Sequence, residues 1–246
     1  MNATSRDRGI DLSVVIPVYN ERDNLEPLLT ELEGVLRSLN RSFEVICVDD
    51  KSTDGSLDVL RGLRKTRPFL RILRHSVNSG ESAGEATGFH GARGGIIVTI
   101  DGDQQNDPAD IPALLDALKP DVAAVCGVRR VREDDRIRRL SSLLANGFRN
   151  AVTGDRIADA GCTFRALRRS ALRELPVFNG MHRFLPTLLR RQGFRVVEIP
   201  VNHRPRTRGL SKYGVGNRMW RGLLDCAAMR WYRKRALLCE RVEEEE

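Results

Sequence analysis

Leu12-Ser13-Val14-Val15-Ile16-Pro17-Val18 is the stretch on which the fold depends. A short apolar run rich in β-branched residues and followed by polar ones is typical of a buried parallel strand, and residues 43–48 (FEVICV) form a second such run. Between these runs, one helical face is apolar, with Leu25, Leu28, Leu29, Leu32, Val35, Leu36 and Leu39. The order strand, helix, strand predicts a parallel β-α-β unit.

The same alternation continues along the chain. It predicts helices over residues 56–67, 82–93, near 138–152 and around 182–192, and strands over 70–73, 95–100, 122–126 and 195–201. The expected fold is α/β, with a Rossmann-like, doubly wound and mostly parallel sheet in a single domain. We expect a flexible N-terminus over residues 1–11, this domain over 12–216, and an amphipathic helix with an acidic tail over 217–246.

Charge is distributed unevenly over the 246 residues. Residues 1–121 carry 14 basic and 20 acidic side chains and residues 122–246 carry 27 basic and 13 acidic ones, so the net charges of the two halves are −6 and +14. The second half therefore favours an anionic partner, which could be nucleic acid, acidic lipid or a phosphorylated substrate. The basic run from Arg204 to Arg208 has no interleaved aromatic residues and no recognition motif, so no nucleic-acid partner is expected.

The five cysteines form no CxxC pair and no basic-then-apolar leader is visible, so a reduced, cytoplasmic setting is expected. No window of about eighteen residues is continuously apolar, so membrane contact is expected to be peripheral, on the cytoplasmic face. The C-terminal segment supplies a candidate, with Trp220, Leu223, Leu224, Ala227 and Trp231 on one helix face among flanking cations. Such a face favours an anionic membrane surface; packing on the domain or on a second subunit is the alternative.

Polar clusters follow three of the predicted strands: Tyr19-Asn20-Glu21, Asp49-Asp50 and Asp101-Gly102-Asp103. In open parallel sheets, ligands bind beyond the carboxyl ends of the strands, so these clusters predict the position of the site. The glycine between Asp101 and Asp103 allows both carboxylates to face one point, where a hard divalent cation could hold a diphosphate. A solvated turn, or the N-cap of the helix that follows Asp107-Pro108, is the alternative.

Several motifs, in this order along the chain, resemble family 2 glycosyltransferases. They are VIPVYNE at 15–21, VDDKSTDG at 48–55, DGDQQNDP at 101–108, DAGC at 159–162, MHRF at 181–184 and HRPRTRGLSKY at 203–213. Within that family the chain is most similar to the branch of dolichyl-phosphate mannose synthase and bacterial polyprenyl-phosphate glycosyltransferases. The resemblance covers about residues 12–216 and implies a GT-A fold. Gly102, where alanine is usual, and Glu81, where many relatives carry a basic or neutral residue, depart from the pattern.

The resemblance implies a pocket for a nucleotide-diphosphate sugar. In the family the two acids of the DxD motif, here Asp101 and Asp103, hold the nucleotide and Mg²⁺ or Mn²⁺, with Gln105 close to the metal or the sugar. Arg206 and Lys212 are expected to stabilise the charge on the departing diphosphate. The complete predicted donor set is Pro17, Tyr19, Glu21, Asp50, Asp101, Asp103, Gln105, Arg206 and Lys212.

An arginine-rich stretch, residues 128–139, holds six arginines in twelve residues. Guanidinium groups suit phosphate oxygens, and the family pattern implies that Arg129 and Arg138 hold the acceptor phosphate, with Ser142 as a weaker companion. Most of the other arginines in the stretch are interpreted as part of a solvated loop. The candidate catalytic residues are therefore Asp101, Asp103, Arg129, Arg138, Arg206 and Lys212.

The expected reaction is transfer of a sugar, with inversion, from a nucleotide-diphosphate sugar to undecaprenyl, dolichyl or another polyprenyl phosphate, for cell-envelope glycan synthesis or lipid modification. That acceptor is already ionised, so no general base is nominated. One alternative is a family 2 transferase acting on a sugar or lipid hydroxyl, for which Asp101 is the first base to examine. A catalytically silent, nucleotide-sugar-binding subunit of a membrane complex is another. A membrane-embedded protein partner and a homo-oligomer both stay open.

Overall fold

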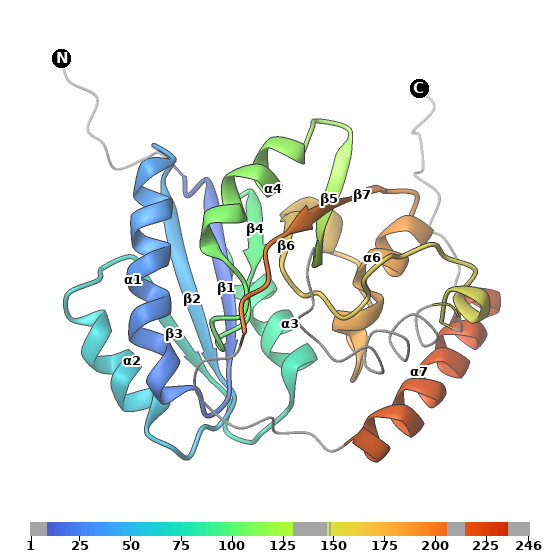
Figure 1. Cartoon of the computed structure of the whole chain (residues 1–246), viewed down its shortest axis with the longest axis horizontal. Helices are drawn as coiled ribbons and strands as arrows, with labels where there is room; N and C mark the ends of the chain where they lie inside the picture. Colours follow the sequence, from blue (N-terminus) through green and yellow to red (C-terminus); the bar gives the residue numbers. More distant parts are fainter. Residues whose placement is uncertain (1–8, 130–146, 148, 206–214, 236–246) are drawn as a thin grey trace, which may run out of the picture.

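The computed structural model of the chain describes residues 9–129, 147, 149–205 and 215–235. Its centre is a seven-stranded sheet with the order β3-β2-β1-β4-β6-β5-β7 (Figure 1). The strands are β1 (Leu12–Val18), β2 (Phe43–Asp49), β3 (Leu70–Arg74), β4 (Ile96–Thr99), β5 (Val122–Arg129), β6 (Arg165–Arg168) and β7 (Arg195–Val201). Only β6 runs antiparallel to its neighbours, β4 and β5. The predicted mostly parallel α/β sheet is confirmed.

Helices cover both faces of this sheet. One apolar cluster joins it to α1 (Arg22–Ser38), α2 (Ser56–Arg64) and α4 (Ile111–Ala117), and a second joins it to α3 (Glu81–Gly91), α6 (Met181–Arg191) and α7 (Val215–Arg235). Val14 and Ile16 of β1 enter the first cluster and Val15 enters the second, which explains the continuous apolar run of this strand. Figure 1 shows α2 and α7 at opposite ends of the longest axis.

Short elements complete the fold. Two 3-10 turns, η1 (Pro108–Asp110) and η2 (Arg169–Leu172), follow the DxD segment and β6, and residues 147 and 149–153 are helical. The helix predicted near 138–152 thus lies partly outside the described residues. Strand β5 continues to Arg129, three residues beyond its predicted end, and α2 ends at Arg64 rather than at residue 67.

Helix α3 approaches β1 unusually closely. A Cβ atom added to Gly88 would lie 2.2 Å from Cγ1 of Val15, and one added to Gly84 would lie 3.1 Å from Cβ of Pro17. Glycine at both positions therefore allows the helix to rest on the strand. The close packing fixes the first residues of α3, including Glu81, at the carboxyl edge of the sheet.

In the part of α7 whose side chains the structure describes, one side packs on the domain. Cys226 and Met229 are buried in the second apolar cluster, whereas Leu224 and Trp231 are 54% and 65% exposed. Packing on the domain and an exposed apolar face therefore occur together on opposite sides of the helix. Within the described ranges, no helix is long and apolar enough to span a membrane.

Candidate active site

The turn after β4 carries the DxD acids and is braced by its own side chains. The backbone N–H of Asp101 donates to Oδ1 of Asn106 at 3.2 Å, and that of Gln105 donates to Oδ1 of Asp103 at 3.1 Å. Asp107 accepts a 3.0 Å bond from the N–H of Ala109 and so caps η1. Because Asp107 caps the turn, the carboxylates of Asp101 and Asp103 are not needed as N-caps.

The carboxyl end of β1 lies against this turn. A Cβ atom on Gly102 would sit 3.4 Å from the carbonyl oxygen of Pro17 and 3.5 Å from Cγ of Glu21, which are ordinary contacts. Alanine would therefore fit at position 102, and the departure from the family pattern costs the site nothing. The structure brings Pro17, Glu21 and the DxD turn together, and the assignment of Pro17, Tyr19 and Glu21 to the nucleotide stays a prediction.

Asp50 organises the loop that precedes α3. Its carboxylate accepts bonds from the N–H groups of Ser79 (2.8 Å) and Gly80 (2.7 Å), and it lies 2.7 Å from Nδ1 of His75. Sequence reasoning assigned Asp50 to the nucleotide and missed this structural role. Any nucleotide contact has to use the remaining lone pairs of the carboxylate, and it stays a prediction.

The segment 159–163, which precedes β6, reaches the first acid of the motif. The hydroxyl of Thr163 donates a 2.6 Å bond to Oδ1 of Asp101. Burial raises the pKa of Asp101 to about 7, the carboxylates of Glu81 and Asp103 raise it as well, and Thr163 and Arg165 act in the opposite direction. The ionised form of Asp101 is therefore disfavoured by burial and by two nearby carboxylates, and a bound cation would offset both effects.

Arg129, at the end of β5, forms a two-pronged ion pair with Asp159. Its Nε and Nη2 atoms lie 2.7 and 2.8 Å from the two carboxylate oxygens. Burial alone would lower the pKa of Arg129, but the bonds and charge of Asp159 raise it, and Asp101 adds to that effect. Part of the guanidinium is thus committed to holding segment 159–163, and its remaining N–H groups are the ones available to an acceptor.

Two buried ionisable side chains, Arg165 and Glu85, lie close to the first DxD acid. Arg165 of β6 is fully buried, and among the described residues none of its three guanidinium nitrogens has a hydrogen-bond partner. Glu85 of α3 is 1% exposed; burial raises its pKa to about 8, and the nearby Arg165 lowers it. Sequence reasoning missed both residues, and the only signal was a charged residue inside the apolar register of β6.

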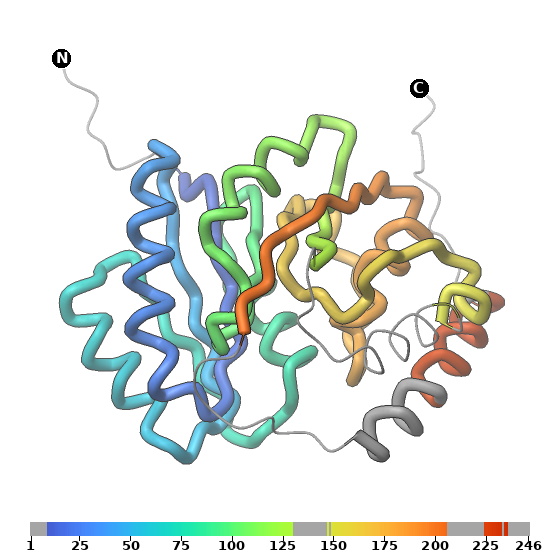
Figure 2. Tube along the Cα trace, in the orientation of Figure 1, coloured from blue at the N-terminus to red at the C-terminus, as the bar shows by residue number. Residues whose placement is uncertain are grey.

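The segment after β7 returns to the DxD turn, as Figure 2 shows. Asn106 pairs with His203 in an antiparallel bridge, and the N–H of Arg204 donates a 2.8 Å bond to the carbonyl oxygen of Gln105. The side-chain amide of Gln105 points back to the carbonyl oxygen of Arg204 at 3.4 Å. Four predicted site residues, Arg138, Ser142, Arg206 and Lys212, lie outside the described residues.

The oxygen-rich side chains of Asp101, Asp103 and Gln105 are the type that Mg²⁺ and Mn²⁺ prefer. Within the described part of the chain, no three His, Cys, Asp or Glu side chains converge closely enough to bind a metal by themselves. The residues thus fit a cation that takes its other ligands from a bound diphosphate or from water.

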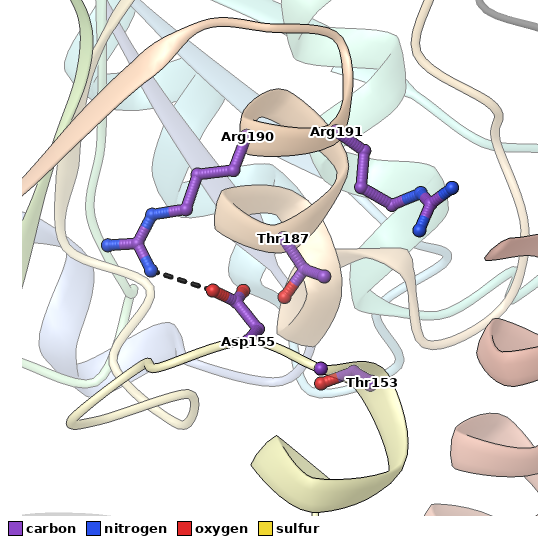
Figure 3. Close-up of a pocket in the computed structure, with 6 residues that line it drawn as sticks. Thr153, Asp155, Thr187, Arg190 and Arg191 are labelled. Carbon is purple, nitrogen blue, oxygen red and sulfur yellow. Dashed lines mark hydrogen bonds and ion pairs between the residues drawn. The ribbon is translucent and has the colours of Figure 1, made fainter.

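A pocket of about 480 Å³ lies away from these residues, between α6 and residues 153–155 (Figure 3). Figure 3 shows Arg190 and Arg191 pointing to opposite sides of α6, with Arg190 directed at Asp155. Nη1 of Arg190 lies 2.7 Å from Oδ1 of Asp155 and also donates to the carbonyl oxygen of Arg156 at 3.2 Å. The Arg190 guanidinium is therefore already bonded within the protein. Its bonds hold α6 against residues 155–156, at the start of the segment that leads to Thr163.

The sequence model described as "Glycosyl transferase family 2" matches residues 13–176, which include β1, the DxD turn and Thr163. The chain belongs to glycosyl transferase family 2. The predicted family is confirmed, and the match spans every described element from β1 to η2.

Curated relatives of this family 2 chain include two enzymes named for polyprenyl-phosphate acceptors. The undecaprenyl-phosphate 4-deoxy-4-formamido-L-arabinose transferase of Edwardsiella ictaluri is 36% identical over 206 residues, which are 83% of this chain and 63% of that protein. The dodecaprenyl-phosphate galacturonate synthase of Rhizobium johnstonii is 33% identical over 230 residues, 92% of this chain and 68% of that protein. The chain therefore spans about two thirds of the length of these relatives.

Solved structures support the fold. A mannosyltransferase from Pyrobaculum calidifontis, in complex with GDP-Man and Mn²⁺, matches with a TM-score of 0.62 and 22% identity over 93% of this chain and 65% of that one. The glucosyl-3-phosphoglycerate synthase of Mycobacterium tuberculosis, in complex with Mn²⁺, UDP and phosphoglyceric acid, matches with a TM-score of 0.68 and 20% identity over 93% of this chain and 80% of that one. At this identity the likeness shows the GT-A fold alone.

Proposed function

We propose that the chain transfers a sugar from a nucleotide-diphosphate sugar to a polyprenyl phosphate. The observation that carries this proposal is the link from the DxD acids to Arg129: Asp101 is bonded to Thr163, and the same segment is held at Asp159 by Arg129. The segment 159–163 thereby connects the DxD acids, which suit a metal-bound diphosphate donor, to Arg129, which suits an acceptor phosphate. The names of the two curated relatives, both acting on polyprenyl phosphates, support the choice of acceptor.

In this reaction the acceptor phosphate is already an anion, so the chain's task is to align two anions and offset their charge. Asp101, Asp103 and Gln105 would hold Mg²⁺ or Mn²⁺, which supplies charge stabilisation to the diphosphate when bound. Arg129, with Arg138 and Ser142, would hold the attacking phosphate. Arg206 and Lys212 would neutralise the departing nucleotide diphosphate. They come shortly after Arg204 in the sequence, and the backbone N–H of Arg204 is bonded to Gln105. Inversion at the sugar carbon follows from a single displacement.

A membrane surface is the proposed place of action. Trp231 and Leu224 present apolar surface to solvent on α7, and Arg230, Lys234 and Arg235 are exposed near them. Apolar side chains ringed by cations suit the headgroup region of an anionic bilayer, where a polyprenyl phosphate resides. We propose that α7 docks on the cytoplasmic face and brings the site to its lipid acceptor.

A second candidate is transfer to a hydroxyl group, and the pKa of Asp101, raised to about 7 by burial and by Glu81, favours it. A carboxyl with such a pKa could remove a proton from a hydroxyl near neutral pH. The two reactions differ in their need for a base, since an ionised phosphate requires none.

The test is turnover by the purified full chain with Mn²⁺, a panel of nucleotide sugars, and undecaprenyl phosphate beside a neutral polyprenol. Asp103→Asn should abolish product formation, because a metal-binding carboxylate is lost without creating a cavity. Asp116→Asn, which removes an exposed carboxylate from α4, should leave turnover unchanged. Full activity of Asp103→Asn or in excess chelator would contradict the metal assignment. Product with polyprenol alone would favour the hydroxyl reaction, and no product with any donor would favour a silent binding subunit.

A further inference from the structure

The segment after β7, residues 202–204, is bonded to both ends of the stretch that follows the DxD acids. The backbone N–H of Asn202 donates a 2.6 Å bond to Oδ2 of Asp110 in η1, and its side-chain amide donates to Oδ1 of the same carboxylate at 3.0 Å. Two residues later, the N–H of Arg204 donates to the carbonyl oxygen of Gln105 at 2.8 Å. The backbone of this segment therefore fixes where the Arg204 side chain begins.

The Arg204 side chain joins the DxD turn to the first helix. Its Nη2 atom lies 2.8 Å from Oδ1 of Asp107, and its Nη1 atom lies 2.7 Å from Oε2 of Glu31 in α1. The two acids are 97 and 173 residues away in the sequence. Because the guanidinium is planar and its nitrogens point in fixed directions, it holds both carboxylates at a defined separation.

The residues that Arg204 holds are the ones that support the DxD acids. The N–H of Gln105 donates to Oδ1 of Asp103 at 3.1 Å, and Oδ1 of Asn106 accepts a 3.2 Å bond from the N–H of Asp101. Arg204 is bonded to the residues on either side of Asn106, through its backbone on one side and its guanidinium on the other. The geometry of both acids is thus connected to α1 through one arginine.

We propose that Arg204 is a positioning residue for the divalent-metal site. Its bridge between Asp107 and Glu31 holds the DxD turn in the shape in which the two DxD acids bind the cation. This role rests on the proposed function, in which those acids hold Mg²⁺ or Mn²⁺. Groups that orient metal ligands without touching the metal change metal affinity about 10- to 100-fold when they are removed.

The sign of the effect separates positioning from charge. Arg204 is a cation beside a turn of metal-binding acids, so the loss of its charge alone would strengthen Mn²⁺ binding. Loss of the bridge weakens that binding. The effect on stability is small, because the side chains of Arg204 and Glu31 are 38% and 40% exposed, and exposed ion pairs contribute little to folding. Weaker Mn²⁺ binding at a nearly constant Tm is therefore the signature of a positioning residue.

The experiment titrates Mn²⁺ into the full chain and follows the electron paramagnetic resonance signal of the free ion, with UDP in one series and GDP in another. Arg204→Ala should raise the Kd of Mn²⁺ about tenfold and lower Tm by less than about 5 °C. Glu31→Ala should raise the Kd as well, and the double variant should raise it no more than Arg204→Ala does, because both changes break one bridge. Arg37→Ala, which removes an exposed arginine paired with Glu33 on α1, is the matched control and should leave the Kd unchanged.

The outcomes separate this role from the proposed function. Unchanged or tighter Mn²⁺ binding in Arg204→Ala overturns the role of Arg204 and leaves the proposed function standing. Additive effects in the double variant, an equal loss in Arg37→Ala, or a larger fall in Tm that accompanies the weaker binding also overturn it. Absence of Mn²⁺ binding by the unaltered chain with either nucleotide contradicts the proposed function, and the role of Arg204 falls with it.

Discussion

The Thr163 hydroxyl and the Asp101 carboxylate are joined by a 2.6 Å hydrogen bond across 62 residues of sequence. Thr163 follows the Asp159 that Arg129 holds, and Asp101 begins the DxD turn. The bond favours the ionised form of Asp101, against burial and the charges of Glu81 and Asp103. The protonation state of the first DxD acid therefore depends on a residue just before the antiparallel strand β6.

Thr163→Val removes this donor and keeps the volume of the side chain. A hydrogen bond to a charged group contributes about 1.5–3 kcal/mol, so turnover at pH 7 should fall about tenfold or more. The pKa of Asp101 should rise further, and because the ionised fraction then recovers only at higher pH, the acid limb of the pH–rate profile should move upward. Thr163→Ser keeps the hydroxyl and should retain the original profile. Identical profiles for the valine and serine variants would show that the bond has no effect on the site.

The Arg129–Asp159 pair allows the structural and acceptor roles of Arg129 to be separated. Arg129→Ala removes the cation that pairs with the largely buried Asp159 carboxylate and should lower the free energy of unfolding by about 3 kcal/mol. Turnover at low acceptor concentration should fall because the apparent affinity for undecaprenyl phosphate is lower, while the Kd of the nucleotide sugar changes little. Chemical denaturation and calorimetry of donor binding measure the two effects.

The double variant Arg129→Ala, Asp159→Ala is the control, because it removes the buried Asp159 charge as well. It should recover most of the lost stability and none of the acceptor affinity. Recovery of acceptor use together with stability would mean that Arg129 only holds the segment 159–163 in place.

Glu85 should make the chain less stable as pH rises. Its pKa is raised from 4.5 to about 8 by burial, so the folded chain binds this proton more tightly than the unfolded chain does. Stability is then lost between about pH 4.5 and 8, by at most about 1.4 kcal/mol per pH unit. Glu85→Gln should flatten the free energy of unfolding measured in urea at pH 5.5, 6.5 and 7.5, whereas the exposed Asp58→Asn should not. Parallel curves for Glu85→Gln and the unaltered chain would contradict the raised pKa.

The fold was largely predictable because β1, β2 and α1 each carry one clear period of apolar residues. The run at 12–18 is buried on both faces, and α1 buries the leucines that its spacing placed on one side. Strand β6 was missed for a physical reason: two of its four residues are arginines, and Arg165 is buried among the charges of α3 and the DxD turn. The sequence around Arg165 does not show that acids more than sixty residues away, Glu85 and Asp101, lie near it in the folded chain.

The site was predictable at the DxD turn and less so around it. Polar clusters at strand ends indicated where Asp101 and Asp103 lie, because that edge is common to all parallel strands. The groups that act on Asp101 come from other parts of the chain, Thr163 from the segment before β6 and Glu81 from α3. Asp50 was assigned to a ligand although its carboxylate holds the loop before α3, since sequence does not distinguish a carboxylate facing a ligand from one facing backbone N–H groups.

The last prediction concerns the exposed side of α7. Removing the whole helix would also expose the core around Cys226 and Met229, so point variants on the solvent side are the sharper test. Leu224→Ser with Trp231→Ser removes apolar surface that is already exposed and leaves the fold unchanged. The variant should sediment with phosphatidylglycerol vesicles about 30-fold less tightly, which corresponds to about 2 kcal/mol of lost apolar burial.

Cations on the same helix add a second, separable contribution. Raising the salt concentration from 50 to 300 mM should weaken binding of the unaltered chain, because screening shortens the reach of Arg230, Lys234 and Arg235 toward anionic lipid. Ala228→Ser, an exposed small residue of the same helix, is the matched control and should bind as the unaltered chain does. Donor binding in solution should be equal in all three proteins, because α7 holds none of the residues assigned to the donor. Equal sedimentation of the double variant and the control at both salt concentrations would exclude this face of α7 as the membrane contact.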